Sequence, residues 1–559
     1  MSEKQKSKRI FYGFLILLTL INLLQSFATE LILDESYYWY FSKNLDWGYF
    51  DHPPMVAFLV KIGSALFNKE LGVRFFSAFL FSGTIYFLWK AIDNTLKYEN
   101  VKLFCVLTAS VALFNVYGFF MLPDTPLLFF AALFLWAYKK FLEQEKTLHI
   151  IILAISMTGM MYSKYHAVLV IGFIIASNIK LLFNKRFWTA AILALILYSP
   201  HLYWLYENDF NSLKYHLIER ANSKYKISFT LDYLLGFFTT IGLAFPVVYW
   251  SFYNYKKETV FDKGLSFIVY GIFIFFLISS FNRRTQAQWT LLVMLPLIII
   301  SFKYALHHQN IKKWLYRLST VGLIIILFLR VALIDERVSP ILYESHGNKK
   351  WVAELQKKSK GRPIVFRNSY TNATMYSFYS GIDAISANGF PFRENQFDLD
   401  SSEYKFQRKD VAFLSAQKDA DATFEYTQKR KNIRWKGIFL DNYFSYRKLK
   451  ITLDEKGFNT SGKDSISFQL KNPYHEKIKL SQLKFYGLTL TQKKAVIDTL
   501  YLSLRKNLDN KIILPKESIK IKAKLENPDK LKGASFFRIT IRENNLPMGF
   551  QGNIISLEK

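Results

Sequence analysis

The sequence predicts a polytopic α-helical membrane protein that carries a water-exposed C-terminal domain, with an α/β part and a β-sandwich part. Three observations lead to this fold class. Residues 10–334 contain one apolar run after another, and most of these runs are long enough to cross a bilayer. Residues 335–559 instead have the composition of a soluble domain, rich in Lys, Asn, Asp and Ser. The mean hydropathy of +0.10 averages over these two unlike parts.

The apolar runs predict about eleven transmembrane helices, within a transmembrane domain of residues 1–334. The approximate spans are 10–29, 72–95, 102–120, 122–140, 148–162, 165–183, 187–206, 231–253, 264–281, 288–303 and 316–334. The first run is long for a signal peptide and more spans follow it, so we expect an uncleaved first helix. Residues 55–67 are too short to span and predict an amphipathic helix in the membrane interface.

The formal charge of +30 could indicate a nucleic-acid partner. We expect none, because much of the basic charge lies in short loops between apolar runs, as the positive-inside rule requires. With the N-terminus in the cytoplasm, the loops that fall inside hold Lys97, Lys102, Lys139, Lys140, Lys180, Lys185, Arg186, Lys256, Lys257, Lys312, Lys313 and Arg317. The opposite loops hold fewer cations and more acids. This orientation places the C-terminal domain outside, after an odd number of crossings.

The C-terminal domain is expected to have two parts. Residues 335–430 predict a small α/β region, because strand-like segments recur at 363–366 and 411–414. Residues 431–559 predict a β-rich, sandwich-like domain, because Ser518 to Leu525 alternates apolar and polar residues with period two. The chain has one cysteine, so no intramolecular disulfide stabilises this domain and its core must suffice.

Ionisable side chains gather in the predicted outer loops. They are Asp34 and Glu35 after the first helix, Asp51 and His52 further on, Asp124 at the start of the fourth helix, Lys164 after the fifth, and Arg283 and Arg284 after the ninth. Charges near lipid are costly unless they are paired or functional. Both cations can bind a phosphate. Lysine does so as a point charge, and arginine as a bidentate hydrogen-bond donor. The acids suit a general base or a metal.

Each of these residues also has an ordinary structural interpretation. Asp34 with Glu35 could cap a helix or be solvated, and Asp124 could be an N-cap. His52 precedes two prolines and could belong to a stiff turn. Lys164 could be a lysine that extends its amine to the interface. The arginine pair could bind acids of the outer domain or lipid phosphate. Their convergence at one membrane face favours a common site.

Five motifs stand out in the membrane part. They are Asp34-Glu35, Gly48-Tyr-Phe-Asp-His-Pro-Pro54, Leu122-Pro-Asp-Thr-Pro126, Ser163-Lys-Tyr165 and Pro200-His-Leu-Tyr-Trp204. Together they resemble the class C glycosyltransferases (GT-C), and more closely the bacterial protein-mannosyltransferase-like branch, which includes the lipid A aminoarabinose transferases. The resemblance covers about residues 10–334 and implies a GT-C fold there. Beyond residue 335 the similarity is one of architecture only.

The resemblance implies a polyprenyl-phosphate sugar donor, a lipid A, glycan or protein acceptor, and a place among the lipids of a bacterial cytoplasmic (inner) membrane. It implies that Asp34 is the base or the group that orients the acceptor nucleophile, that Glu35 supports it or binds acceptor, and that Asp124 is a second acid. His52 stands where aminoarabinose transferases have a lysine. The expected phosphate contacts are therefore His52, Lys164, Arg283 and Arg284, and the transferred sugar could be a hexose rather than a pentose. Asp51 could help to hold a divalent metal together with a histidine of the fourth outer loop.

We expect an inverting, single displacement at the anomeric carbon. Two alternatives remain open on the sequence. A transporter (flippase) for lipid-linked sugars would fit many spans and basic patches, but the ionisable residues sit at one face rather than at mid-span. A non-catalytic scaffold would leave the convergence of acids and cations unexplained.

Overall fold

The computed structural model describes residues 2–219, 225–390, 392–417, 422–428, 432–453, 458–459, 465–504, 508, 510–544 and 546–558. The chain divides into two compact units, residues 1–348 (the membrane unit) and residues 349–559 (the C-terminal unit). The boundary between the two units therefore follows residue 348, whereas the predicted transmembrane domain ended at residue 334. The chain after the last membrane helix still packs on the membrane unit, where the His346 ring bonds the Ala332 carbonyl at 2.9 Å.

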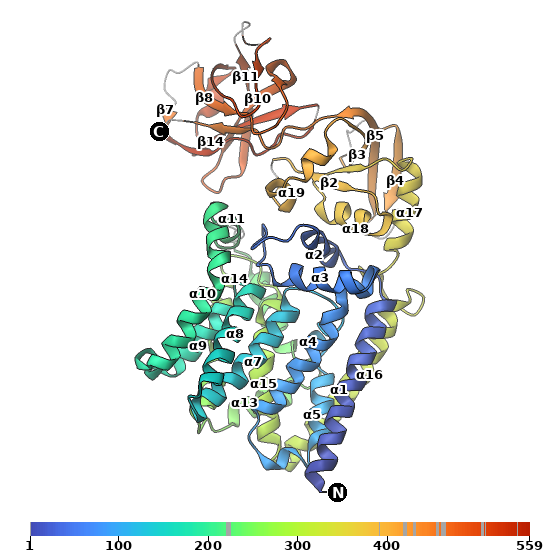
Figure 1. Cartoon of the computed structure of the whole chain (residues 1–559), viewed down its shortest axis with the longest axis vertical. Helices are drawn as coiled ribbons and strands as arrows, with labels where there is room; N and C mark the ends of the chain where they lie inside the picture. The colour runs from blue at the N-terminus through green and yellow to red at the C-terminus, as the bar shows by residue number, and fades with distance from the viewer. Residues whose placement is uncertain are drawn as a thin grey trace. The chain divides into compact units, whose positions relative to one another are not determined.

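The prediction of a multi-pass helical membrane protein is confirmed. Among the described residues, seven helical segments are by themselves long and apolar enough to cross a membrane. They are α1 (Glu3–Ala28), α4 (Lys69–Ala91), α7 (Asp124–Glu143), α10 (Lys185–Glu207), α14 (Val260–Ser280), η4 with α15 (Ala287–Ala305) and α16 (Gln309–Ile334) (Figure 1). Each corresponds to one predicted span.

The other predicted spans are shorter helices or pairs of helices. They correspond to α8 (Thr147–Ser163), to α5 (Val101–Ala109) with α6 (Ala112–Val116), to α9 (Ala167–Ser177) with η2 (Ile179–Phe183), and to α12 (Ile227–Thr239) with α13 (Phe245–Asn254). A backbone feature marks one of these breaks. Gly242 has φ +82° between α12 and α13, and Pro246 lies in the first turn of α13.

Two short helices lie at the end of the bundle opposite the N-terminus, namely α2 (Leu33–Lys43) and α3 (Met55–Leu66) (Figure 1). Helix α3 is the predicted short helix. It turns back tightly into α4, and a Cβ on Gly63 would lie 2.2 Å from the Gly72 carbonyl oxygen. The two glycines therefore permit a backbone approach that larger residues would prevent.

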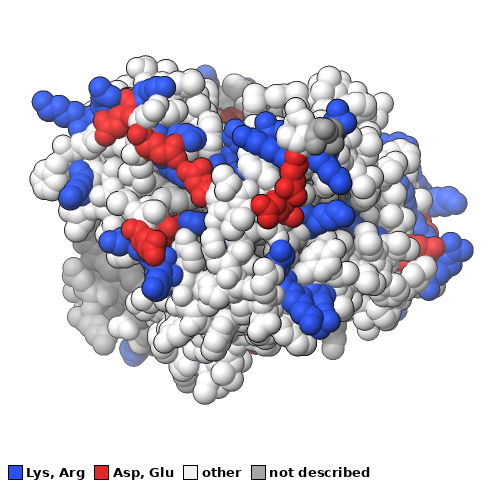
Figure 2. Space-filling model, turned by 90° about the horizontal axis from the view of Figure 1, so that it is seen from below, with Lys and Arg blue, Asp and Glu red and all other residues white. Residues whose placement is uncertain are grey.

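The loops at the N-terminal end of the bundle contact one another. Asn94 bonds His307 at 3.0 Å, Lys139 pairs with Asp93 at 2.8 Å, and Asn184 bonds Glu145 at 2.6 Å. Figure 2 shows this end, where Lys and Arg side chains cover more of the face than Asp and Glu do. These loops are the ones to which the sequence assigned the cytoplasmic cations. Their grouping at one end agrees with the predicted alternation of spans.

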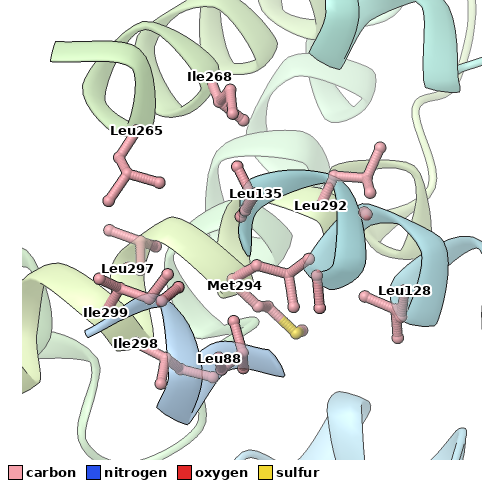
Figure 3. Packing of buried hydrophobic residues seen from close by; sticks show 14 of the residues in the cluster. Leu88, Leu128, Leu135, Leu265, Ile268, Leu292, Met294, Leu297, Ile298 and Ile299 are labelled. Atoms are coloured by element: carbon pink, nitrogen blue, oxygen red, sulfur yellow. The ribbon is translucent and has the colours of Figure 1, made fainter. Parts of the chain in front are cut away.

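A hydrophobic core fills the middle of the membrane unit around α15. Leu297, Ile298 and Ile299 of α15 are fully buried. Figure 3 shows them near Leu88 of α4, with residues of α7 and α14 beyond. In contrast, α1, α10 and α16 keep many large apolar side chains exposed, such as Leu24 at 69%. A soluble protein would bury these side chains, whereas lipid solvates them.

The C-terminal unit begins with the predicted α/β part. Its five-stranded sheet has the order β2-β1-β3-β5-β4, and β1 is parallel to both β2 and β3. The elements are α17 (Asn348–Lys358), β1 (Ile364–Arg367), α18 (Tyr370–Ser380), β2 (Ala384–Ala387), α19 (Gln396–Leu399), η5 (Ser402–Phe406), β3 (Lys409–Ser415), β4 (Phe424–Gln428) and β5 (Ile433–Tyr443). Since β5 pairs with β3, this part runs to Tyr443 rather than to 430.

The remainder is β-rich, as predicted. Its strands are β6 (Lys450–Thr452), β7 (Phe458–Asn459), β8 (Ser465–Lys471), β9 (Ile478–Lys479), β10 (Leu483–Leu490), β11 (Val496–Leu504), β12 (Ile512–Ile513), β13 (Ser518–Leu525), β14 (Phe536–Glu543) and β15 (Ile554–Glu558). Eight of them form one sheet, β6-β8-β13-β11-β10-β14-β15-β7, and β12 pairs with β9. A bridge from Ile451 to Gly552 links the β6 edge back toward β15. Eight strands thus form one sheet that curls back on itself, where a sandwich would have two facing sheets, and β9 with β12 forms a separate short pair.

Candidate active site

Glu35 fixes α2 against α4 through a fully buried ion pair. Arg74 of α4 donates to the Glu35 carboxylate from Nε at 2.7 Å and from Nη2 at 2.5 Å. Both side chains are 0% exposed. The same carboxylate accepts the backbone N–H groups of Ile32 and Met121 at 3.1 and 3.0 Å. With its oxygens occupied in this way, Glu35 holds the start of α2 against α4.

Asp34 precedes Glu35 in the first turn of α2, and its side chain is exposed. A carboxylate is favoured there, because the free N–H groups of a helix start carry partial positive charge. The Asp34 carboxylate acts electrostatically on Tyr117, and the Asp124 carboxylate acts on the same hydroxyl. Asp34 and Asp124 therefore both lie within electrostatic range of the Tyr117 hydroxyl.

Asp124 begins α7 and pairs with Lys164, which directly follows α8. The Lys164 amine donates to both Asp124 oxygens, at 2.7 and 2.9 Å. The side chains are 7% and 10% exposed. The two predicted residues are thus partners, and the lysine neutralises an acid that the apolar surroundings would otherwise disfavour. Any contact of Lys164 with a donor phosphate would have to share this amine with Asp124.

The Asp51-His52 segment is anchored by residues far along the chain. The His216 ring bonds the Asp51 carbonyl at 2.8 Å, and the His52 and His216 rings lie 6.2 Å apart. Tyr165, next to Lys164, lies 5.8 Å from the His216 ring and within electrostatic range of Asp51. Residues 164 and 165 therefore connect the Asp124 side of the site with the His52 side.

A fully buried histidine holds the start of the same loop. His201 of α10 uses Nδ1 on the Trp47 carbonyl at 2.6 Å, and Nε2 lies 3.2 Å from the Tyr165 hydroxyl. Gly48 packs flat on the Trp204 ring, and a Cβ there would lie 2.3 Å from the ring. The motif of residues 200–204 thus positions the loop that carries Asp51 and His52.

The two adjacent arginines differ. Arg283 donates to the His216 carbonyl at 2.7 Å, and its guanidinium lies 5.7 Å from the Trp289 ring centre. Arg284 is exposed and makes a loose ion pair with Asp232 at 3.5 Å. The structure brings Arg283 to the His52 side of the site and does not bring Arg284 there.

Across the part of the chain that the structure describes, no three His, Cys, Asp or Glu side chains come together as metal ligands would. His216, the nearest histidine of the fourth loop, bonds the backbone of Asp51 through its Nε2 atom.

Two buried arginines of the membrane unit are not among the residues predicted from the sequence. One is Arg74. The other is Arg330 of α16, which donates to Asn115 at 2.8 and 2.6 Å and to Asn22 at 2.6 Å, so that three helical segments are joined. Each lies within an apolar run, and a charge in such a run is the signal that would have identified it.

Comparison with known proteins gives a family-model match to part of the chain and a shared fold. Residues 51–204 match the family model of dolichyl-phosphate-mannose-protein mannosyltransferases. The chain is 22% identical over 279 residues to the lipid A galacturonosyltransferase RgtD of Rhizobium johnstonii, a match that covers 47% of this chain. The match spans 58% of the length of that relative.

The fold is similar to that of two solved structures. The crystal structure of ArnT from Cupriavidus metallidurans in the apo state superimposes with a TM-score of 0.59 and 11% identity, covering 78% of this chain and 98% of that one. The structure of the same protein, ArnT from Cupriavidus metallidurans, bound to undecaprenyl phosphate superimposes with a TM-score of 0.57 and 12% identity. This superposition covers 76% of this chain and 97% of that one. The predicted resemblance to the bacterial protein-mannosyltransferase-like branch is therefore confirmed, by sequence within residues 51–204 and by fold over most of the chain.

Proposed function

We propose that this chain is a membrane glycosyltransferase that moves a sugar from a polyprenyl-phosphate donor to an acceptor. The observation that carries the proposal is the buried Asp124–Lys164 pair, whose neighbour Tyr165 lies 5.8 Å from the His216 ring beside His52. An exposed acid beside a buried acid–cation pair provides both a base and a place for an anionic leaving group. The fold shared with ArnT, which has been crystallised with undecaprenyl phosphate, supports a lipid-phosphate donor.

The reaction would be one displacement at the anomeric carbon. An acceptor hydroxyl or phosphate oxygen attacks this carbon, and the bond between the carbon and the donor phosphate oxygen breaks. The leaving polyprenyl phosphate takes the electron pair, and Asp34 accepts the proton of an attacking hydroxyl. A single step inverts the anomeric configuration.

The leaving phosphate would lie near His52, Arg283 and Lys164. Cations stabilise the charge that develops on a leaving phosphate, most effectively where water is excluded. Arg283 and His52 both adjoin His216, so they suit one phosphate. Lys164 would lower the barrier further if its amine turned from Asp124 toward the phosphate as the bond breaks.

The site would work on the outer face of the cytoplasmic membrane of a bacterium, with the C-terminal unit outside. Nucleotide sugars do not cross the membrane, so an outer site needs a sugar already carried on a lipid. RgtD is named for lipid A, and lipid A is the acceptor we favour, with a glycan or protein as alternatives. The sugar is a hexose or a pentose.

A divalent metal at Asp51 is a separate proposal with its own test. Transfer is measured after dialysis against a chelator and after return of Mg²⁺, Mn²⁺ or Zn²⁺. Loss and recovery of transfer would establish a metal requirement, and unchanged transfer would end this proposal.

The decisive experiment uses purified protein in liposomes with radiolabelled polyprenyl-phosphate sugars and an envelope extract as acceptor. Asp34→Asn removes the base with little change in size, and Glu336→Gln, an exposed acid after α16, is the matched control. We expect transfer by the wild type and by Glu336→Gln, and none by Asp34→Asn.

Two results would overturn the proposal. If no donor gives transfer and labelled lipid instead moves between leaflets, the chain is a flippase. If Asp34→Asn transfers sugar as the wild type does, Asp34 is not the base.

A further inference from the structure

The outer face of the curled eight-stranded sheet carries a group of exposed cations. Strand β13 buries every second residue in the hydrophobic core, so the residues between them point outward. The register of the sheet brings cations of β6, β8, β10 and β14 to the same outer face. We call this surface the basic face, and its exposed members are Lys450, Lys471, Lys484, Lys520, Lys522, Lys524 and Arg542.

The strands of the basic face supply almost no compensating acid. Strands β6, β8, β10 and β13 contain no Asp or Glu. Asp498 of β11 pairs with Lys530, and Glu543 of β14 is buried. Glu526, directly after β13, accepts the Ser503 hydroxyl at 2.7 Å. Among the described residues, no carboxylate forms an ion pair with a cation of the basic face, so its positive charge is not balanced by them.

Like charges lie directly opposite each other at two places on this face. Lys450 of β6 is the register partner of Lys471 of β8, and Lys484 of β10 is the partner of Arg542 of β14. Opposite Cβ atoms are about 5 Å apart, and like charges in such positions destabilise a sheet. The three lysines of β13 recur at every second residue, about 7 Å apart. Negative charge supplied by a partner would replace this repulsion with attraction.

The position of these lysines in the sheet also argues for a partner. Lysines on an edge strand commonly prevent sheets of different molecules from pairing. That role does not explain the basic face, because β13 and β10 are interior strands with a neighbour on each side.

Two tyrosines lie among the cations. Tyr501 of β11 is the register partner of Tyr486 of β10, and their ring centres are 5.5 Å apart. Tyr501 is 45% exposed, so its ring offers an apolar surface against which the C–H face of a pyranose can pack. Neutral side chains that can hydrogen-bond sugar hydroxyl groups stand directly opposite the three β13 lysines, namely Gln469, Ser467, Ser465 and Ser503.

We propose that the basic face docks a polyanionic glycan, whose repeated carboxylate or phosphate groups meet the lysines while a sugar ring packs against Tyr501. Such a glycan matches the cations, the exposed ring and the hydroxyl and amide groups together. A simple polyanion would use the lysines alone. The proposal goes beyond the transferase reaction and does not rest on it.

The test measures binding to the full chain in phosphatidylcholine nanodiscs, without any sugar donor, so that it is independent of transfer. The probes are an oligogalacturonate and a phosphorylated dextran, with neutral galactan and dextran of the same lengths. We expect the anionic glycans to bind at least roughly tenfold more tightly than the neutral ones, and added salt to weaken them. Lys520→Gln, Lys522→Gln and Lys524→Gln together should weaken the anionic glycans by at least roughly tenfold.

Matched variants separate the basic face from net charge alone. Lys493→Gln, Lys494→Gln and Lys532→Gln together remove the same charge from exposed turns of the same domain and should leave binding close to that of the wild type. Tyr501→Thr keeps a residue that suits a strand. It should weaken the anionic glycans severalfold and leave the binding of inorganic polyphosphate unchanged.

Several results would overturn the proposal. One is a failure of both anionic glycans to bind more tightly than their neutral counterparts. Another is an equal loss of binding in the two triple-lysine variants. Unchanged glycan binding by Tyr501→Thr would show that charge alone is recognised. Tighter binding of phosphatidylglycerol vesicles through the same three β13 lysines would make the basic face a membrane-docking surface instead.

Discussion

Arg74 of α4 and Glu35 of α2 join through two hydrogen bonds, at 2.7 and 2.5 Å, with both side chains fully buried. The pair ties the first outer helix to the bundle, and Arg74 also caps the end of α1 by donating to the Thr29 carbonyl at 2.6 Å. Glu35, which is fully buried, therefore fixes the backbone position of its exposed neighbour Asp34. The two consecutive acids differ in burial because only Glu35 faces Arg74.

Removing one member of this pair should be severe. Glu35→Gln leaves the Arg74 charge buried without a counter-charge, and we expect a loss of about 3–5 kcal/mol in stability. The apparent melting temperature in detergent measures this loss. Glu35→Gln with Arg74→Met should recover part of it, since neither charge then remains.

The exposed pair Arg337–Asp335 provides the control, because Arg337 is 86% exposed. Arg337→Gln should leave the melting temperature unchanged. An equally small effect of Glu35→Gln would contradict the assignment of Glu35 as a positioning residue.

The Lys164–Asp124 pair allows stability and chemistry to be separated. Lys164→Met and Asp124→Asn should each destabilise the chain and abolish transfer, because each leaves one buried charge. The double variant should regain stability to within about 1 kcal/mol of the wild type and still fail to transfer sugar. Active double-variant enzyme would show that the pair serves only the fold.

Arg283 and Arg284 form a matched pair of neighbours. Arg283→Gln should lower transfer by at least roughly tenfold, because this guanidinium adjoins the proposed phosphate position. Arg284→Gln should stay close to the wild-type rate, since Arg284 is 71% exposed and only loosely paired. Initial rates at saturating acceptor compare the two. Equal effects would remove Arg283 from the phosphate contacts.

Asp398, in α19 of the C-terminal unit, should make stability depend on pH. Burial, and then the charge of Glu394, raise the pKa of Asp398 to about 7. The folded state therefore holds a proton that the unfolded state has lost, so stability falls as pH rises from about 4 to about 7 and then levels. The loss should be of the order of 4 kcal/mol.

Melting of wild type and Asp398→Asn at pH 5.5 and pH 8.0 measures this effect. The amide does not titrate, so the variant should lack the Asp398 part of the pH dependence. The same pH dependence in both proteins would show that another group is responsible.

The orientation of the chain in the membrane can be tested by labelling introduced cysteines, once the single native cysteine has been removed. Cys105 is buried, and Cys105→Ser provides a background for Glu336→Cys and Lys313→Cys at opposite ends of α16. A thiol reagent that cannot cross membranes should label Glu336→Cys in intact spheroplasts and leave Lys313→Cys unlabelled until the cells are broken. The reverse pattern would place the C-terminal unit inside.

The sequence by itself determined the membrane spans, their alternation, the family resemblance and the side of the membrane unit to which the polar motifs belong. Hydropathy and charge are local properties, and lipid imposes them on every segment that crosses it. The alternation of Ser518 to Leu525 likewise predicted strand β13, which buries every second residue.

Only the tertiary structure decided which polar residues are partners. The contacts of Glu35 with Arg74, Asp124 with Lys164 and Arg330 with Asn115 join residues 39, 40 and 215 positions apart. No local pattern specifies such a pairing, because it depends on which helix faces pack together. The curled form of the β sheet could not be predicted from the sequence either. It depends on the bridge from Ile451 to Gly552, which joins segments from opposite ends of the domain.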